Sequence, residues 1–262
     1  MKKKNSREKS KNIRLSVVIP CYNEEENLNQ GVLKEVWSYL KEQEYPWEVI
    51  ISDDGSSDKS LEIATKFAQR HPGFRVLKNK HGGKPWAVWK GIEAAKGEVI
   101  LFTDMDQSTP IKEVEKLLPW FEKGFDIVIG SRGKTRKDAP WLRKVMALSF
   151  LTGRRLLLLR NIIDTQCGFK ALRREAALKI FPKLQFFQEL DKEVKGWRVS
   201  AFDVELLFIA QKLGYKIKEV EVNWQDRDIS QGKQKNFIKE SREMAKEILR
   251  VKINDLLGKY ED

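Results

Sequence analysis

The chain has 262 residues, of which 41% are hydrophobic and 34% charged, and its formal net charge is +12. This length and composition predict one large domain with a buried core, and they exclude disordered and fibrous classes of protein. Two cysteines, Cys21 and Cys167, are too few for a disulfide framework, and the absence of any 18-residue apolar run excludes a spanning helix.

The positive charge is concentrated in two segments. Residues 1–14 carry +6 and residues 132–160 carry +8, whereas the rest of the chain carries −2. Two basic segments on a near-neutral body favour an anionic membrane surface over nucleic acid as the partner, since no RRM-like aromatic pattern or zinc-ligand spacing is present. A flexible solubilising tail explains residues 1–14 equally well. With no signal peptide, we expect a cytoplasmic protein in peripheral contact with a membrane.

Short apolar runs alternate with helix-like segments from residue 15 onward. Strands are expected at residues 15–20, 47–52, 74–79, 98–103 and 126–131. Helices are expected between them at residues 25–42, 57–70, 86–96 and 112–123. This alternation predicts an α/β fold, with a doubly wound, mostly parallel sheet, flanking helices and ligands at the carboxyl ends of the strands.

The pattern changes beyond residue 132. Residues 140–160 form a basic, apolar-rich helical stretch suited to a membrane surface, or alternatively a core helix with snorkelling arginines. A helix at 203–213, a strand at 216–223 and a final amphipathic helix at 237–257 follow. We therefore divide the chain into a basic tail at 1–14, a single catalytic domain at 15–235 (nucleotide-binding half 15–132, acceptor- and membrane-facing half 133–235) and a C-terminal helix at 236–262.

Two aspartates directly follow the apolar run of the fourth expected strand. Asp104 and Asp106 flank Met105. Alternating aspartates at a strand end place two hard carboxylate oxygens near one point, which suits Mg²⁺ or Mn²⁺ bridging a diphosphate. The cation would neutralise charge on a departing nucleotide diphosphate. A simple loop or helix-cap pair is the alternative.

A second acidic pair, Asp53 and Asp54, follows the second expected strand. Helix capping explains the residues 56–58 that come after it. It does not explain two adjacent carboxylates, whose mutual repulsion predicts a partner such as a base edge, a ribose hydroxyl or a cation.

Several other kinds of site lack sequence support. No GxGxxG and no GxxxxGK[ST] motif is present, which argues against dinucleotide-binding and P-loop proteins. The two histidines, His71 and His81, have no evident partner in the sequence, so a serine or cysteine nucleophile is not supported either.

The motifs together resemble a known family. Residues 17–24 (VVIPCYNE), 53–58 (DDGSSD), 82–84 (GGK) and 103–106 (TDMD) resemble the family-two glycosyltransferases of GT-A fold in order and spacing. Residues 164–170 (DTQCGFK), 201–207 (AFDVELL) and 222–224 (VNW) resemble the dolichyl-phosphate glucose synthase branch, whose close cousin is the mannose synthase.

The resemblance implies a set of site residues. The implied nucleotide and donor contacts are Pro20, Tyr22, Glu24, Ser52, Asp54, Lys84 and the backbone of Met105. The implied metal and diphosphate ligands are Asp104 and Asp106, with Arg227 and Lys233 on a loop that closes over the diphosphate, and with Arg132 and Arg143 at the acceptor phosphate. Met105 stands where the glucose branch usually has alanine, which changes the expected shape of the sugar pocket.

The implied activity is inverting transfer of a hexose, in the first place glucose from UDP-glucose, to a polyprenyl or dolichyl phosphate at the cytoplasmic membrane face. A GDP-mannose-dependent mannosyltransferase and a soluble family-two enzyme with a saccharide acceptor are the alternatives. A phosphate acceptor is mostly dianionic near neutral pH because its second pKa is about 6, so it needs no general base. No oligomeric state follows from the sequence.

Overall fold

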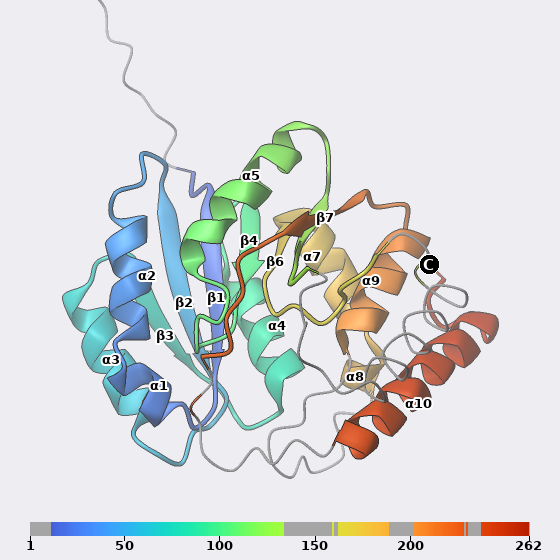
Figure 1. Ribbon diagram of the computed structural model, residues 1–262, viewed down its shortest axis with the longest axis horizontal. Coiled ribbons are helices and arrows are strands. Elements are labelled where there is room, and N and C mark those ends of the chain that lie inside the picture. Colours follow the sequence, from blue (N-terminus) through green and yellow to red (C-terminus); the bar gives the residue numbers. More distant parts are fainter. Residues whose placement is uncertain are drawn as a thin grey trace, which may run out of the picture.

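The structure, a computed structural model, describes residues 12–133, 159, 162–188, 202–227, 229 and 237–261. In these ranges, seven strands form one sheet in the order β3-β2-β1-β4-β6-β5-β7 (Figure 1). The strands are β1 (Leu15–Cys21), β2 (Trp47–Asp53), β3 (Phe74–Lys78), β4 (Val99–Phe102), β5 (Ile127–Ser131), β6 (Lys170–Arg173) and β7 (Ile217–Glu221). All strand pairs are parallel except those of β6, which is antiparallel to β4 and to β5. The predicted mostly parallel α/β fold is confirmed.

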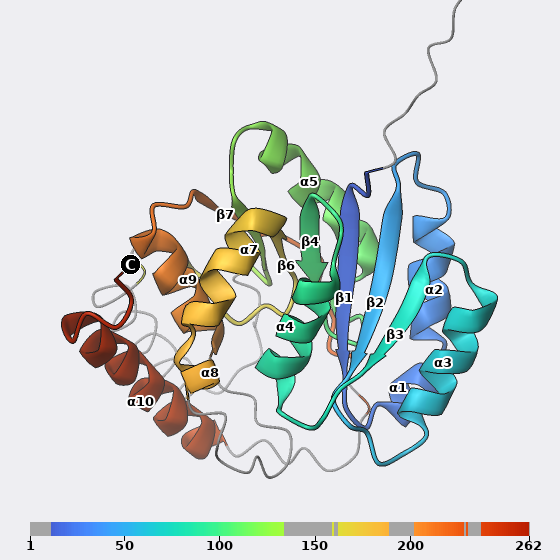
Figure 2. The same cartoon turned by 180° about the vertical axis from the view of Figure 1, so that it is seen from behind.

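Helices cover both faces of the sheet. They are α1 (Glu25–Asn29), α2 (Val32–Leu40), α3 (Ser60–Arg70), α4 (Lys84–Ala94), α5 (Val114–Glu122), α7 (Arg174–Ile180), α8 (Gln185–Gln188), α9 (Phe202–Lys212) and α10 (Phe237–Leu256). Because successive strand residues face opposite ways, Val17 and Ile19 of β1 pack with α2 and α5, whereas Val18 packs with α4, α7 and α9. Figure 1 shows α5 in front of the sheet, and Figure 2 shows α4 and α7 in front of its other face.

Two local features differ from the sequence-based expectation. The helix expected at residues 25–42 is broken into α1 and α2, because Gly31 has a left-handed φ of 80° that an α-helix cannot contain. Strand β6 was not predicted, since only two of its four residues (KALR) are apolar and they form neither an apolar run nor an alternation. Its antiparallel direction brings the residues just before it to the carboxyl end of β4.

Some predictions fall on residues that the structure does not describe. These are the basic stretch at 140–160 apart from Leu159, which is buried in the core, and the site residues Arg143 and Lys233. The proposed division into tail, catalytic domain and C-terminal helix stays a prediction. Within the described ranges, no helix combines the length and apolar character needed to cross a bilayer.

Candidate active site

The loop after β4 presents two aspartates at the carboxyl edge of the sheet. The loop is held by its own hydrogen bonds: Ser108 N–H donates to Asp106 Oδ1 (2.8 Å), and the Gln107 side-chain amide donates to the Asp104 carbonyl (2.9 Å). Gln107 adopts a left-handed φ of 51°, which is uncommon for a residue other than glycine. This turn keeps the Asp104 side chain 40% exposed in the middle of the sheet edge.

Lys84 pairs directly with the first of these aspartates. It opens α4, and its Nζ lies 2.5 Å from Asp104 Oδ1. Burial lowers the pKa of Lys84, but the charges of Asp104 and Asp203 outweigh it and hold that pKa above its ordinary value. A cation from α4 thus stands beside the carboxylates of the β4 loop.

The residues before β6 form the wall behind Asp104. Lys170 of β6 lies opposite Phe102 of β4, and continuing this register by two residues places Gly168 opposite Asp104. A Cβ atom added to Gly168 would lie only 2.0 Å from Asp104 Oδ2. Because glycine has no Cβ, residue 168 leaves room for the Asp104 carboxylate in its observed position.

Lys170 supports this wall from inside the core. Its side chain is fully buried, and Nζ donates to Asp203 Oδ1 (2.6 Å) and to the Cys167 carbonyl oxygen. Asp203 lies in the first turn of α9. A lysine this deep requires a paired carboxylate, so the pair ties β6, α9 and the residues beside Asp104 together.

Arg132, which directly follows β5, is oriented by Asp164. Its Nε and one terminal nitrogen donate to the two oxygens of Asp164 at 2.7 and 2.9 Å, and its backbone N–H donates to Oδ2 at 3.0 Å. Burial alone would raise the pKa of Asp164, but the hydrogen bonds from Arg132 outweigh it and hold that pKa below its ordinary value. The guanidinium carbon lies 5.7 Å from the ring centre of Trp224.

The segment after β7 brings Arg227 to the same edge. Ser108 receives two hydrogen bonds from this segment, from Gln225 N–H to its carbonyl (2.8 Å) and from Arg227 N–H to its hydroxyl (3.2 Å). The Arg227 guanidinium binds both oxygens of Glu35 in α2 at 2.8 Å, and this hydrogen bonding lowers the pKa of Glu35. The hydrogen bonds to Glu35 raise the pKa of Arg227, and the charge of Asp106 adds to this effect.

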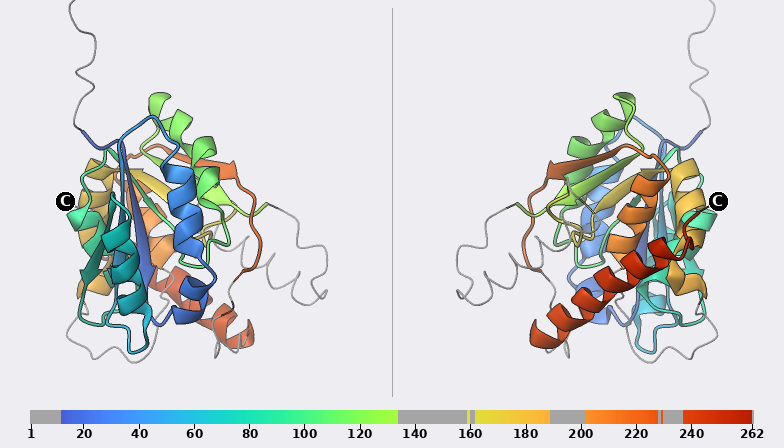
Figure 3. Two further views of the ribbon diagram at one scale, coloured as in Figure 1. Left: turned by 90° about the vertical axis from the view of Figure 1, so that its left-hand side faces the viewer. Right: turned by 90° about the vertical axis from the view of Figure 1, so that its right-hand side faces the viewer.

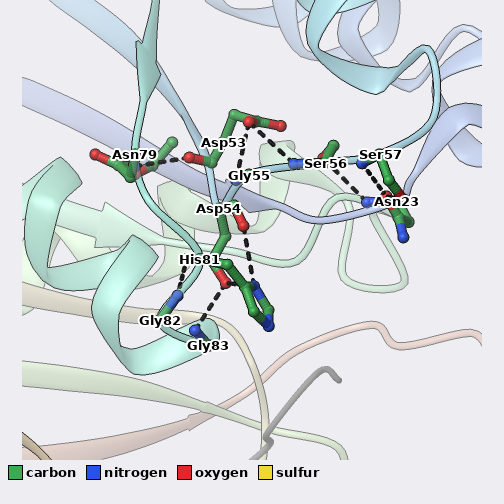
Figure 4. A network of polar contacts seen from close by, with 11 residues as sticks. Asn23, Asp53, Asp54, Gly55, Ser56, Ser57, Asn79, His81, Gly82 and Gly83 are labelled. Atoms are coloured by element: carbon green, nitrogen blue, oxygen red, sulfur yellow. Dashed lines mark hydrogen bonds and ion pairs between the residues drawn. The ribbon is translucent and has the colours of Figure 1, made fainter. Parts of the chain in front are cut away.

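The acidic pair at the end of β2, Asp53 and Asp54, finds its partners inside the protein (Figure 4). Asp54 accepts hydrogen bonds from Gly82 N–H (2.9 Å) and Gly83 N–H (2.7 Å), and His81 Nδ1 lies 2.9 Å from its Oδ2. Burial raises the pKa of Asp54 to about 6, although these hydrogen bonds act in the opposite direction and lower it. The expectation that His81 lacks a partner is therefore wrong, because the fold brings together two residues that are 27 positions apart in the sequence.

Asp53 has a different environment. Its Oδ2 accepts from the N–H groups of Gly55 and Ser56, at 3.0 and 3.2 Å, which forms the turn into the next helix. Its buried Oδ1 has no hydrogen-bond partner among the described residues. The repulsion between the adjacent carboxylates is thus relieved largely by backbone N–H groups, and a ligand is not required to explain them.

The other residues expected at the nucleotide are distributed around this edge. Tyr22 stacks on His81 with ring centres 4.4 Å apart, and Glu24 accepts a hydrogen bond from the Asn27 amide (2.6 Å). Ser52 and Pro20 are buried, and the Ser52 hydroxyl accepts from Asn79 at 3.0 Å.

Met105, between the two aspartates, is buried. Its side chain is 2% exposed and belongs to the core cluster that contains residues of α2 and α5. The expected effect of this larger residue on the sugar pocket stays a prediction.

The structure thus gathers most of the predicted residues at one edge of the sheet. Reasoning from the sequence missed the residues that position them, which are Glu35, Asp164, Gly168, Lys170 and Asp203. A polar residue in an apolar segment was the available signal for Lys170 and Asp203, because such a residue needs a buried partner.

Fold and site together define a glycosyltransferase of the GT-A type. The defining features are a doubly wound sheet and an aspartate pair at the end of a central strand. A mannosyl-3-phosphoglycerate synthase of Rubrobacter xylanophilus has this fold, with a TM-score of 0.64 and 15% identity over 94% of this chain and 76% of its own. A glucosyl-3-phosphoglycerate synthase of Mycobacterium tuberculosis, solved with Mn²⁺ and UDP, matches with a TM-score of 0.55 and 20% identity over 94% and 80%.

The chain belongs to glycosyl transferase family 2, which matches residues 16–181. A dolichyl-phosphate beta-glucosyltransferase of Dictyostelium discoideum is 36% identical over 264 residues, covering 94% of this chain and 76% of that protein. The prediction of a family-two glycosyltransferase is confirmed.

Proposed function

We propose that this enzyme transfers glucose from UDP-glucose to a polyprenyl phosphate of the dolichyl type, at the cytoplasmic face of a membrane. The relative from Dictyostelium supports this donor and acceptor class through its name. The observation that carries the proposal is the pair Asp104 and Asp106 at a central strand end, with the cations Lys84, Arg132 and Arg227 at the same edge of the sheet. Such a site suits a reaction between two phosphate-bearing substrates.

The aspartate pair fits a divalent cation shared with the donor. Both side chains supply hard oxygens and are partly exposed, as Mg²⁺ and Mn²⁺ require. No group of three or more Asp, Glu, His or Cys side chains in the described ranges could hold a metal, so the donor diphosphate would complete the ligand set. The cation would supply charge neutralisation on the departing diphosphate.

The basic residues of the site would bind and orient the two anions. Lys84 lies next to Asp104, where it can contact the donor, and Arg132 is held by Asp164 in an orientation that leaves it 27% exposed. Bidentate arginine is well suited to a phosphate, and the ion pair with Asp164 fixes the plane of its guanidinium in advance. Arg227, Lys233 and Arg143 remain predicted phosphate contacts.

The reaction requires no proton transfer from the acceptor. A phosphate monoester with a second pKa of about 6 is already a dianionic nucleophile near neutral pH. In a single displacement, an acceptor phosphate oxygen forms a bond to the sugar anomeric carbon while the bond from that carbon to the UDP oxygen breaks. The product of an α-linked donor is then β-linked.

The test is a panel of radiolabelled nucleotide-sugars, including UDP-glucose and GDP-mannose, offered with polyprenyl phosphate in detergent. We expect lipid-extractable label from UDP-glucose only, lost with EDTA and restored by Mn²⁺ or Mg²⁺. Asp104→Asn and Asp106→Asn should abolish transfer, while the exposed Glu62→Gln should not. Transfer from GDP-mannose would contradict the proposed donor. Label in a water-soluble saccharide would contradict the proposed acceptor, and an α-linked product would contradict the single displacement.

A further inference from the structure

The C-terminal helix α10 has two opposite apolar faces, of which one is buried. On the inner face, Ile248 and Val251 join the core beside α9 with exposed fractions of 6% and 0%. Tyr260 just after the helix donates from its hydroxyl to the fully buried Glu205 (2.6 Å), and Asn254 donates to Gln185 (3.2 Å). Buried apolar contacts and hydrogen bonds therefore hold the orientation of this helix.

The outer face of α10 is unusually apolar for an exposed surface. Leu249, Ile253, Leu256 and Leu257 are 58%, 47%, 75% and 66% exposed. Steps of three and four residues connect the first three, so they share one side of the helix, and Leu257 lies next to them. Single exposed apolar residues need no explanation, but a continuous row marks a contact surface. We call these four residues the outer apolar row.

A positive charge adjoins the start of this row. Lys246 is exposed and lies one three-residue step before Leu249, on the same side of the helix. An apolar row that begins beside a cation matches the boundary between the headgroups and acyl chains of an anionic bilayer.

The position of the helix agrees with this partner. The first turn of α10 lies at the same end of the molecule as the carboxyl ends of β1 and β2, and the helix runs along the outside of the fold (Figures 1, 2 and 3). The outer apolar row lies on the later half of α10, and a bilayer along the length of the helix would extend past its first turn toward the carboxyl end of the sheet. A polyprenyl phosphate could then present its phosphate to the site while its chain stays in the membrane.

The geometry points to the outer apolar row as a docking surface for an anionic lipid bilayer. This inference rests on the proposed lipid-phosphate acceptor for its biological purpose. It also identifies a specific surface, which the proposed activity does not require.

Vesicle co-sedimentation tests the inference. The probes are vesicles of phosphatidylcholine alone and of phosphatidylcholine with phosphatidylglycerol. The combined substitution Leu249→Gln, Ile253→Gln and Leu256→Gln should weaken partitioning onto anionic vesicles by ~10-fold or more, since it removes the apolar groups that insert. The combined Leu249→Met, Ile253→Leu and Leu256→Met variant keeps the row apolar and should bind as the wild type does.

A charge variant provides the second arm. Lys246→Glu should weaken binding to anionic vesicles by about tenfold and leave binding to neutral vesicles unchanged. Lys66→Glu makes the same charge change on the exposed surface of α3 and should have no effect. Equal vesicle binding by the triple glutamine variant and the wild type would overturn the inference. A change of oligomeric state in that variant with vesicle binding intact would overturn it too, assigning the row to a second copy of the chain.

Turnover in detergent separates this inference from the proposed function. The triple glutamine variant should transfer glucose to detergent-dispersed polyprenyl phosphate at the wild-type rate, because the row is remote from the aspartates. Normal turnover with unchanged vesicle binding would reject the docking surface alone. A wild type that binds vesicles through the row but transfers no glucose would reject the proposed function alone.

Discussion

Gly168→Ala tests whether the place of the Asp104 carboxylate matters to catalysis. The added Cβ would lie 2.0 Å from Oδ2, 2.6 Å from Cγ and 2.9 Å from Oδ1 of Asp104. An ordinary carbon–oxygen contact is about 3.3 Å or longer, so the carboxylate must move by roughly 1 Å or more. No left-handed φ is found at Gly168, so alanine adds little backbone strain there.

The expected effect falls on activity and not on folding. A displacement of about 1 Å at a reacting centre can cost on the order of 10²-fold in rate. The Asp104 side chain is 40% exposed and can rotate toward solvent, so the free energy of unfolding should change by less than about 1 kcal/mol. Initial rates of glucose transfer in detergent and urea unfolding curves measure the two quantities.

Gly124→Ala is the matched control for this prediction. Gly124 has a left-handed φ of 80°, and nothing lies within 4 Å of an added Cβ. Alanine there should lower the free energy of unfolding by about 1 kcal/mol and leave the rate unchanged. If Gly168→Ala kept a rate within about twofold of the wild type, the position of Asp104 would not control the chemistry.

Three further predictions concern buried charges. The pKa of Asp54 is raised from 3.8 to about 6, so its favourable contribution is fully present below pH 3.8 and lost as the pH rises through 6. Urea unfolding should show wild type losing on the order of 2 kcal/mol relative to Asp54→Asn between pH 4 and pH 7, and equal pH slopes would refute this. Asp164→Asn should raise the KM for polyprenyl phosphate several-fold, because it releases Arg132 from its two-point pair, and an unchanged KM would argue against that role. Lys170→Met should destabilise the fold by about 3 kcal/mol by leaving Asp203 unpaired, whereas adding Asp203→Leu should recover more than half of that loss in urea unfolding. A double variant no more stable than the single one would show that the pair does not act as a unit.

The alternation of strands and helices and the position of the aspartate pair could be predicted because they depend on local patterns. Apolar runs of four to seven residues separated by helical segments indicate parallel strands, and parallel strands share one carboxyl edge. Asp104, Asp106 and Arg132 could therefore be assigned to one edge from the sequence, with the family motifs adding Lys84 and Tyr22.

The partners of those residues could not be predicted, because they come from distant segments. Lys170 and Asp203 are 33 residues apart, and Arg132 and Asp164 are 32 apart. Their meeting depends on β6, which has only two apolar residues, too few to be recognised as a strand, and which runs antiparallel to its neighbours.

What the sequence by itself determined is the class of fold, the polar edge of the sheet and the family, since all three follow from periodicity and motif spacing. Only the tertiary structure decided that Asp54 accepts hydrogen bonds from Gly82 and Gly83, that Gly168 lies against the Asp104 carboxylate and that one apolar face of α10 stays exposed. The physical reason is that hydrogen bonding and burial depend on which remote groups come within a few ångströms, and only the register of the packed elements sets those distances.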